Sequence, residues 1–195
     1  MISRIVTLLR NWKSAKSAFS TLSYLYSGKS DALDALGGLT DEEMQGLIRW
    51  LPDAGTFVEV GTLFGITAKS VKRAKPNLRV VAVDNFSWNP FGLPSRVHEQ
   101  FTRRILDGSG VELVNCSSAD WRTKSPSPSA VFFDASHAYE DVKEECEWAK
   151  AQGVPLIAGH DYNNANPRFG VTRAVDEVFG KANVETAGMC WRAKA

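Results

Sequence analysis

Short apolar runs alternate with longer amphipathic segments along most of the chain. The runs are four or five residues long and are bounded by charged or turn-forming residues, which is typical of strands buried on both faces of a sheet. They fall at residues 56–60, 79–83, 111–114, 130–133 and 154–158. The last part of the chain predicts two further short strands.

The amphipathic segments repeat apolar residues at helical spacing. They cover residues 66–74, 95–106, 139–151 and 171–179, and each follows one of the predicted strands. Residues 115–129 are polar and contain proline, and we predict that they form a connection. Regular alternation of strand and helix predicts an open parallel sheet that is covered by helices on both faces.

A further helix is expected before the first strand. Thr40 is followed three residues later by Glu43, which is the capping-box pattern of a helix N-terminus. We expect this helix to run to about Trp50, because Pro52 and Gly55 end it before the first strand.

The first strand is predicted to end at Glu59 and to pass into a turn that contains Gly61 and Gly65. Such a turn lets a ligand approach bare backbone, and the helix N-terminus behind it favours polar or anionic groups. The Gly-x-Gly-x-x-Gly pattern of dinucleotide-binding turns is absent. Glu59 would repel a pyrophosphate and attract an ammonium. A simple strand-to-helix turn, with no ligand, is the alternative.

Length and composition indicate one globular domain. The chain has 195 residues, of which 44% are hydrophobic and 23% charged, and its formal net charge is +1, so nothing global favours nucleic acid binding. The cysteines are Cys116, Cys146 and Cys190, an odd number without paired short spacing. They predict neither a disulfide framework nor a zinc site, and we expect reduced thiols in a cytoplasmic protein.

Basic residues are concentrated at the start of the chain. Residues 1–30 hold five basic side chains and no acid, and their apolar residues lie mostly at helical spacing. The pattern fits a helix that packs on the domain or on a second subunit, a helix at a membrane surface, or a flexible leader. We therefore expect an N-terminal helical extension over residues 1–50 and a main domain over 51–195.

The acid-x-Gly-x-x-x-Gly run at residues 59–65, followed by a strand that ends in Asp84, resembles the class I S-adenosylmethionine-dependent methyltransferases. The resemblance implies a three-layer α/β sandwich with a mostly parallel, seven-stranded, Rossmann-like sheet. In that family the first acid supports the amino-acid end of the cofactor, and the second holds the two ribose hydroxyls. The cofactor-binding residues that the resemblance implies are Glu59, Gly61, Thr62, Gly65, Asp84, Asn85, Ser118 and Asp134.

Three later motifs make the resemblance more specific. They are FDASHAYEDV at residues 133–142, GHDY at 159–162 and GVTRAVDE at 170–177. Their order resembles the branch that includes macrolide-sugar O-methyltransferases and cephalosporin hydroxylase-like proteins. The resemblance covers residues 56–180 and leaves both ends of the chain outside it.

The residues in these motifs suit methyl transfer to oxygen. The acceptor oxygen must be aligned with the methyl carbon and made more nucleophilic. We expect His137 to act as base together with Asp134, since the ordinary pKa of histidine lies near working pH. Asp134 and Asp161 offer oxygen ligands of the kind that hold Mg²⁺, and a bound metal would lower the pKa of the acceptor hydroxyl.

The predicted metal ligands are Asp134, His160 and Asp161. His160 stands where related metal-dependent enzymes often carry an acidic or amide ligand, and histidine suits Zn, Fe or Mn better than Mg. The presence and the identity of a metal therefore stay open. Each residue also has a purely structural alternative: Asp134 as a helix cap, His137 as a backbone partner, and His160 as a packing residue.

The function expected from the sequence is methyl transfer from S-adenosylmethionine to a hydroxyl of a small molecule or sugar, with or without a divalent metal. A non-catalytic cofactor-binding or regulatory module is the alternative, with the basic N-terminal helix used for dimerisation or peripheral membrane contact. A dinucleotide-dependent oxidoreductase or hydroxylase is disfavoured, because its glycine pattern is absent.

Overall fold

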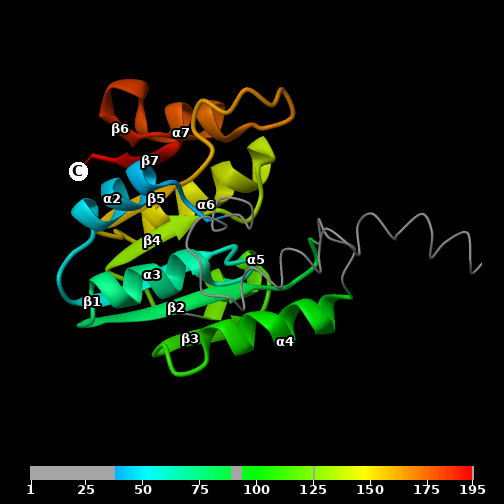
Figure 1. Cartoon of the computed structure of the whole chain (residues 1–195). Coiled ribbons are helices and arrows are strands. Elements are labelled where there is room, and N and C mark those ends of the chain that lie inside the picture. Colours follow the sequence, from blue (N-terminus) through cyan, green and yellow to red (C-terminus); the bar gives the residue numbers. More distant parts are fainter. Residues whose placement is uncertain (1–37, 89–93, 125, 195) are drawn as a thin grey trace, which may run out of the picture.

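The computed structural model describes residues 38–88, 94–124 and 126–194 (Figure 1). The basic helix expected over residues 1–30 lies outside these residues. The dimerisation or peripheral membrane contact predicted for it stays a prediction. None of the helices in the described part of the chain is both long and apolar enough to cross a membrane.

Strands and helices alternate as the apolar pattern predicts. The strands are β1 (Gly55–Val60), β2 (Leu78–Asp84), β3 (Val111–Asn115), β4 (Ala130–Phe133), β5 (Leu156–Gly159), β6 (Val184–Ala187) and β7 (Cys190–Ala193). The helices are α2 (Asp41–Trp50), α3 (Ile66–Ala74), α4 (Ser95–Leu106), α5 (Ser118–Lys124), α6 (Tyr139–Ala151) and α7 (Val171–Phe179), with the short 3-10 helix η3 (Lys181–Asn183).

The strands form a seven-stranded sheet with the order β3-β2-β1-β4-β5-β7-β6. The pairs from β3 to β5 are parallel, and β7 runs antiparallel to both β5 and β6. Chain order reverses between β1 and β4, and ligands of open α/β sheets bind at such a point, outside the carboxyl ends of the strands. The predicted mostly parallel, Rossmann-like, seven-stranded sheet is confirmed.

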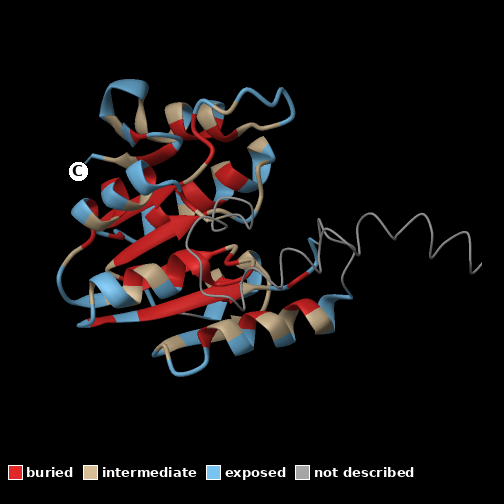
Figure 2. Ribbon diagram, viewed as in Figure 1, coloured by how far each residue is buried: buried red, intermediate tan, exposed pale blue. Residues whose placement is uncertain are grey.

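Helices cover both faces of the sheet, which makes three layers (Figure 1). Apolar residues of α2, α3 and α4 pack with one face of the strands in the first core, and those of α5, α6 and α7 pack with the other face in the second core. Alternate residues of β1 show the division, since Phe57 belongs to the first core and Val58 to the second. Strands β1, β2, β4 and β5 are the most continuously buried part of the fold (Figure 2).

Helix α2 begins with the predicted capping box and is part of the first core. The Thr40 hydroxyl accepts from the Glu43 N–H, and the Glu43 carboxylate accepts from the Thr40 N–H. Leu47 is fully buried in the first core, and the Trp50 indole donates to Glu185 Oε1 at 3.0 Å. The helix before β1 therefore packs directly on the sheet.

The structure corrects two details of the predicted elements. Residues 115–129 are not only a connection, because α5 lies within them. Ser117 Oγ accepts from the Asp120 N–H at 3.0 Å, and Trp121 is buried in the second core, so a cap and one apolar anchor suffice for this short helix. Strand β5 begins at Leu156 and ends at Gly159, later than predicted.

Replacement of Leu47 by Ala tests whether α2 contributes to the core. We expect the free energy of unfolding to fall by ~2–5 kcal/mol, since a fully buried leucine leaves a cavity. Gln45→Ala, at an exposed position of the same helix, should change it by less than ~0.5 kcal/mol. Urea denaturation followed by circular dichroism measures both values, and equal midpoints for the two variants would contradict this role of α2.

Candidate active site

The register of the sheet brings the ends of three strands to one level. Val60 of β1 lies opposite Phe133 of β4, and Phe133 lies opposite Gly159 of β5. The pairing continues for one residue beyond these strands, because Asp134 N–H donates to the Val60 carbonyl at 2.8 Å and His160 N–H donates to the Phe133 carbonyl at 3.1 Å. The polar residues that follow β4 and β5 therefore lie side by side at the carboxyl edge.

Gly61 allows β1 and β4 to come close at this edge. Its φ is +93°, and a Cβ atom built on it would lie 2.3 Å from the Asp134 carbonyl oxygen. A side chain at this position would have to displace backbone. The glycine is thus required for contact between the two strands, whether or not a ligand also passes beside it.

Glu59 is buried beneath the turn that follows β1. Thr62 Oγ1 donates to its Oε2, and the Ala68 N–H, in the first turn of α3, also donates to the carboxyl group. Burial raises the pKa of Glu59 to about 8, although these hydrogen bonds lower it, and the charge of Asp134 adds to the rise. Without a positive partner this carboxyl group is therefore mostly protonated at neutral pH.

Asp84 organises the loops on either side of it. Its Oδ2 accepts from the Leu63 N–H at 2.8 Å, and its Oδ1 accepts from the Phe86 N–H at 2.7 Å. Each carboxylate oxygen keeps a second lone pair that a ligand hydroxyl can use. Asn85, the next predicted cofactor residue, is exposed, and its side chain accepts from the Ser87 N–H at 2.9 Å.

Two acids and two histidines meet beyond β4 and β5. His137 Nε2 lies 2.6 Å from Asp161 Oδ2 and 3.9 Å from Asp134 Oδ1. His160 Nδ1 lies 3.5 Å from Asp161 Oδ2 and 3.8 Å from Asp134 Oδ1. The structure thus brings together all four residues that the later motifs predict for the reacting end of the site.

The four groups shift one another's pKa. Burial raises the pKa of Asp134 to about 7. Burial alone would lower the pKa of His160, but the Asp161, Asp134 and Glu43 carboxylates outweigh it and raise that pKa to about 9. Burial opposes ionisation of Asp161, yet hydrogen bonds to His137 and His160 hold its pKa well below the usual range. Asp161 is therefore the ionised acid of the cluster.

Backbone strain is concentrated at the same edge. Non-glycine residues with a left-handed φ in the described part of the chain are Leu63 at 50°, Phe86 at 55°, Asp161 at 61° and Asn163 at 61°. Each follows a strand end that carries a predicted site residue. A conformation of this kind costs about 1–3 kcal/mol and often marks functional sites, where other contacts hold it in place.

Helix α4 contributes residues that the sequence did not reveal. Thr102 Oγ1 donates to the Leu63 carbonyl at 2.7 Å, and His98 Nε2 lies 3.1 Å from the same oxygen. The His98 ring packs against Phe64 and Phe86. These contacts hold the left-handed Leu63, and with it the turn after β1. The spacing of His98 and Thr102, one helical turn apart, was the available signal.

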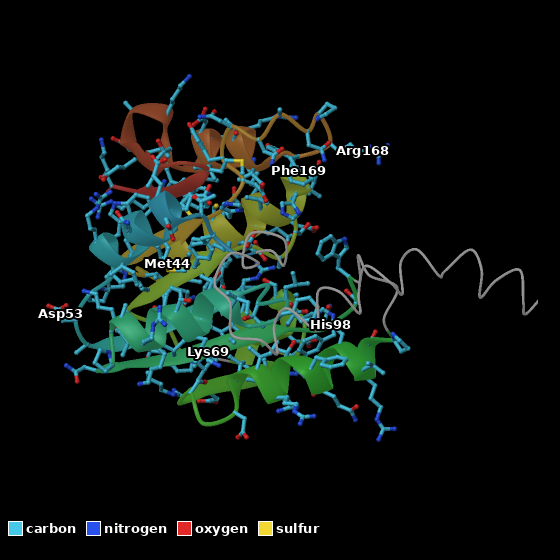
Figure 3. The ribbon with its side chains drawn as sticks, in the orientation of Figure 1. Met44, Asp53, Lys69, His98, Arg168 and Phe169 are labelled. Carbon is cyan, nitrogen blue, oxygen red and sulfur yellow. The ribbon has the colours of Figure 1, made fainter. Side chains whose placement is uncertain are left out.

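Phe169 forms an aromatic wall beside His137. The two rings stack with centroids 4.1 Å apart and an interplanar angle of 18°. Phe169 and the exposed Arg168 lie on the loop between β5 and α7 (Figure 3), and the Gly170 N–H donates to the His137 carbonyl at 2.7 Å. This loop therefore holds the histidine ring in place and forms one rim of the site.

Ser118 lies at the start of α5 and not in an open turn. Its hydroxyl donates to Glu145 Oε1 of α6 at 2.6 Å, while Glu145 Oε2 is buried and makes no hydrogen bond to the described residues. Burial raises the pKa of Glu145 to about 7. The hydroxyl of Ser118 is thereby oriented by α6, which leaves its lone pairs to accept from a ligand.

One group of side chains in the described residues has the spacing of a metal site. Donor atoms of Asp134, His137 and Asp161 all lie within 4.8 Å of one another. The set predicted from the sequence contains His160 instead of His137, and it stays a prediction. Both sets share the two carboxylates.

Several solved structures with a similar fold are methyltransferases. An O-methyltransferase from Bacillus cereus in complex with SAH has a TM-score of 0.60 and 17% identity, and the match covers 90% of this chain and 91% of that chain. A putative O-methyltransferase from Klebsiella pneumoniae has a TM-score of 0.59 and 18% identity, and the match covers 86% of this chain and 91% of that chain. The third structure is the O-methyltransferase TomG from Streptomyces achromogenes, which is involved in tomaymycin synthesis and was solved in complex with SAM. It has a TM-score of 0.57 and 16% identity, and the match covers 95% of this chain and 89% of that chain.

The chain therefore has the fold of the class I S-adenosylmethionine-dependent methyltransferases. Within that class, the O-methyltransferases named above are structures that it resembles over most of its length. No protein-family model matches the sequence, and no curated protein sequence matches it.

The raised pKa of Glu59 makes stability depend on pH. The folded state holds a proton on Glu59 up to about pH 8, whereas the unfolded state releases it near 4.5, so the stabilising effect of the protonated group is lost as pH rises through this window. Each unit of pKa shift corresponds to ~1.4 kcal/mol.

Glu59→Gln should remove this dependence. The variant should match the wild-type protein near pH 5 and exceed it by an amount on the order of several kcal/mol at pH 8. Urea denaturation of both proteins from pH 5 to pH 9, without cofactor, measures the difference. Parallel pH curves would show that the pKa of Glu59 is not raised.

Proposed function

We propose that this protein transfers a methyl group from S-adenosylmethionine to a hydroxyl of a small molecule or sugar. The observation that carries the proposal is the His137–Asp161 pair beside Asp134, at the point of the sheet where the chain order reverses. The glycine turn after β1 lies against the backbone of Asp134 and Ala135. A binding turn and a proton-accepting pair thus share one edge.

The cofactor would lie across the ends of β1, β2 and β4. Glu59, buried and in need of a positive partner, would support its amino-acid end, and Asp84 would hold the ribose hydroxyls. Ser118, whose hydroxyl is oriented by Glu145, would accept a hydrogen bond from the adenine of the cofactor. S-adenosylmethionine, when bound, supplies a methyl group on a positively charged sulfur, which suits an edge lined with acids.

His137 would remove the proton from the acceptor hydroxyl. Its Nε2 is directed at Asp161, so Nδ1 is the ring atom that can accept a proton. Asp161 orients the ring and stabilises the imidazolium that forms, and Phe169 keeps the ring plane fixed. Burial lowers the pKa of His137, but the bond to Asp161 outweighs burial, so the neutral ring becomes available above its ordinary 6.5.

The acceptor would enter beside the loop between β5 and α7. Phe169 offers an apolar face there and Arg168 an exposed cation (Figure 3). A hydroxylated molecule with a ring and a polar or anionic substituent fits such a rim.

A divalent cation between Asp134 and Asp161 is part of the proposal. The two carboxylates and the imidazole of His160, whose Nδ1 lies 3.8 Å from Asp134 Oδ1 and 3.5 Å from Asp161 Oδ2, form a mixed oxygen and nitrogen donor set, which fits Mn, Fe or Zn better than Mg. A cation there would increase the acidity of the acceptor hydroxyl. It would also offset the burial and the neighbouring carboxylate charges that raise the pKa of Asp134 to about 7.

Substitutions separate the binding residues from the base. Glu59→Ala and Asp84→Ala should weaken cofactor binding at least about tenfold, since each removes charge-assisted hydrogen bonds. His137→Ala should leave the cofactor Kd within about twofold and lower kcat by ~10²-fold or more. Asp53→Asn, which changes an exposed acid before β1 at the opposite edge of the sheet, is the matched control.

Calorimetry with S-adenosylmethionine measures binding, and methylation of a panel of phenols and sugars measures turnover. Wild-type protein that binds no cofactor would contradict the proposal entirely. Binding without turnover on any acceptor would instead indicate the non-catalytic module.

Removal of metal tests the cation. Dialysis against a chelator should lower turnover at least about tenfold, and Mn²⁺ should restore it, while Asp134→Asn should prevent the restoration. Binding of Mn²⁺ to the wild-type protein, followed by electron paramagnetic resonance, gives a readout that does not depend on turnover. Full activity in chelator, without Mn²⁺ binding, would leave His137 as the only activating group.

A further inference from the structure

A fifth titratable side chain, from outside the three later motifs, reaches the acid–histidine cluster. Glu43 lies in the first turn of α2 and is 3% exposed, whereas its neighbours Asp41 and Glu42 are exposed. Its Oε1 lies 3.3 Å from Nε2 of His160. An acid that only caps a helix works well at the surface, so capping alone does not explain why this carboxylate is buried beside the cluster.

The carboxylate of Glu43 is held on two sides. Its Oε2 accepts from the Thr40 N–H and hydroxyl, both at 2.9 Å, and its Oε1 accepts from the Met189 N–H at 2.8 Å. Burial alone would raise the pKa of Glu43, but the hydrogen bonds from Thr40 and Met189 and the charge of His160 lower it below its usual value. The group is therefore a fixed anion whose Oε1 is also directed at the His160 ring.

The turn between β6 and β7 is shaped to admit this side chain. Gly188 has a φ of +58°, and a Cβ atom built on it would lie 2.7 Å from Cγ of Glu43. The next residue, Met189, supplies the N–H that binds the carboxylate, and its carbonyl accepts from the Tyr162 N–H at 3.0 Å. The start of α2, the end of the sheet and the segment after β5 thus meet at one carboxylate.

His160 has one ring nitrogen on each side of this arrangement. Nδ1 faces Asp161 and Asp134, while Nε2 is buried and makes no hydrogen bond of normal geometry to the described residues. Among the ion pairs of the described residues, only that with Glu43 involves Nε2 of His160. A carboxylate behind a ring nitrogen decides the orientation of the ring and which nitrogen carries a proton.

We propose that Glu43 is a positioning residue for the reaction: it holds His160 so that Nδ1 is presented to Asp134 and Asp161. The inference rests on the proposed function for its effect on turnover, but the contact itself is a property of the folded chain. Glu43 would act through His160 and would touch neither cofactor nor acceptor. Helix α2 and the β6–β7 turn then belong to the site.

The test compares Glu43→Gln with Glu42→Gln, which removes the same charge from an exposed position in the same helical turn. The chain contains three histidines, so ¹⁵N resonances of the imidazoles can be assigned from single histidine variants. In Glu43→Gln the His160 resonances should shift and those of His98 should not. The kcat of Glu43→Gln should fall by about 10–100-fold, and its KM for S-adenosylmethionine should stay within about twofold of the wild-type value. Glu42→Gln should match the wild-type protein in each measurement.

Two further variants separate positioning from helix capping. Thr40→Ala removes a capping hydroxyl but keeps the Glu43 carboxylate, so its His160 resonances should match those of the wild-type protein. Glu43→Asp keeps the charge but shortens the side chain, so it should disturb His160 and lower kcat even if Glu43→Gln does not fold.

Unchanged His160 resonances in both Glu43 variants would overturn the proposal, and so would an unchanged kcat with shifted resonances. A protein that binds no S-adenosylmethionine would refute the proposed function separately. In that case the imidazole resonances would still decide whether Glu43 orients His160.

Discussion

The close approach of β1 and β4 at their carboxyl ends is the constraint on which the rest of the site depends. Because Gly61 has no side chain, the backbone that follows Glu59 lies against the backbone of Asp134. The contact brings the turn that would bind a cofactor next to the residues that would activate the methyl acceptor. A wider separation would also release Asp134 from the ladder that aligns it with His160.

Crowding of acids at this edge gives the site its chemical character. Glu59 and Asp134 have raised pKa values of about 8 and about 7, because each is buried near other carboxylates. Asp161 stays ionised, since two imidazoles face it. A buried acid that holds a proton for lack of a cation is poised to exchange that proton for a positively charged ligand. The sulfonium and ammonium of a methyl donor, and a divalent metal, are ligands of that kind.

Features with local causes could be predicted from the sequence. The capping box of Thr40 and Glu43 and the glycine turn were visible in the sequence, and so were the acids at or just beyond the carboxyl ends of β1, β2, β4 and β5. Helix α5 was missed because its cap, Ser117, and its single buried anchor, Trp121, lie within a polar stretch.

Contacts between distant segments could not be predicted. His98 of α4 contacts the Leu63 carbonyl in the turn after β1, and Glu43 binds the Met189 N–H, which is 146 positions away in the chain. In both cases the residue already had a sufficient local explanation, as part of an amphipathic helix or as a helix cap. Only tertiary packing shows that it also supports the site.

The position of β7 has a consequence for the order in which the site is assembled. This strand pairs with β5 on one side and β6 on the other, and the Trp191 indole donates to the His160 carbonyl at 3.2 Å. During synthesis the sheet from β3 to β5 can form while residues 190–193 are still inside the ribosome. The segment that carries His160 and Asp161 gains its last neighbour only once these residues have emerged, so a nascent chain would contain every proposed reacting residue before it held them in place.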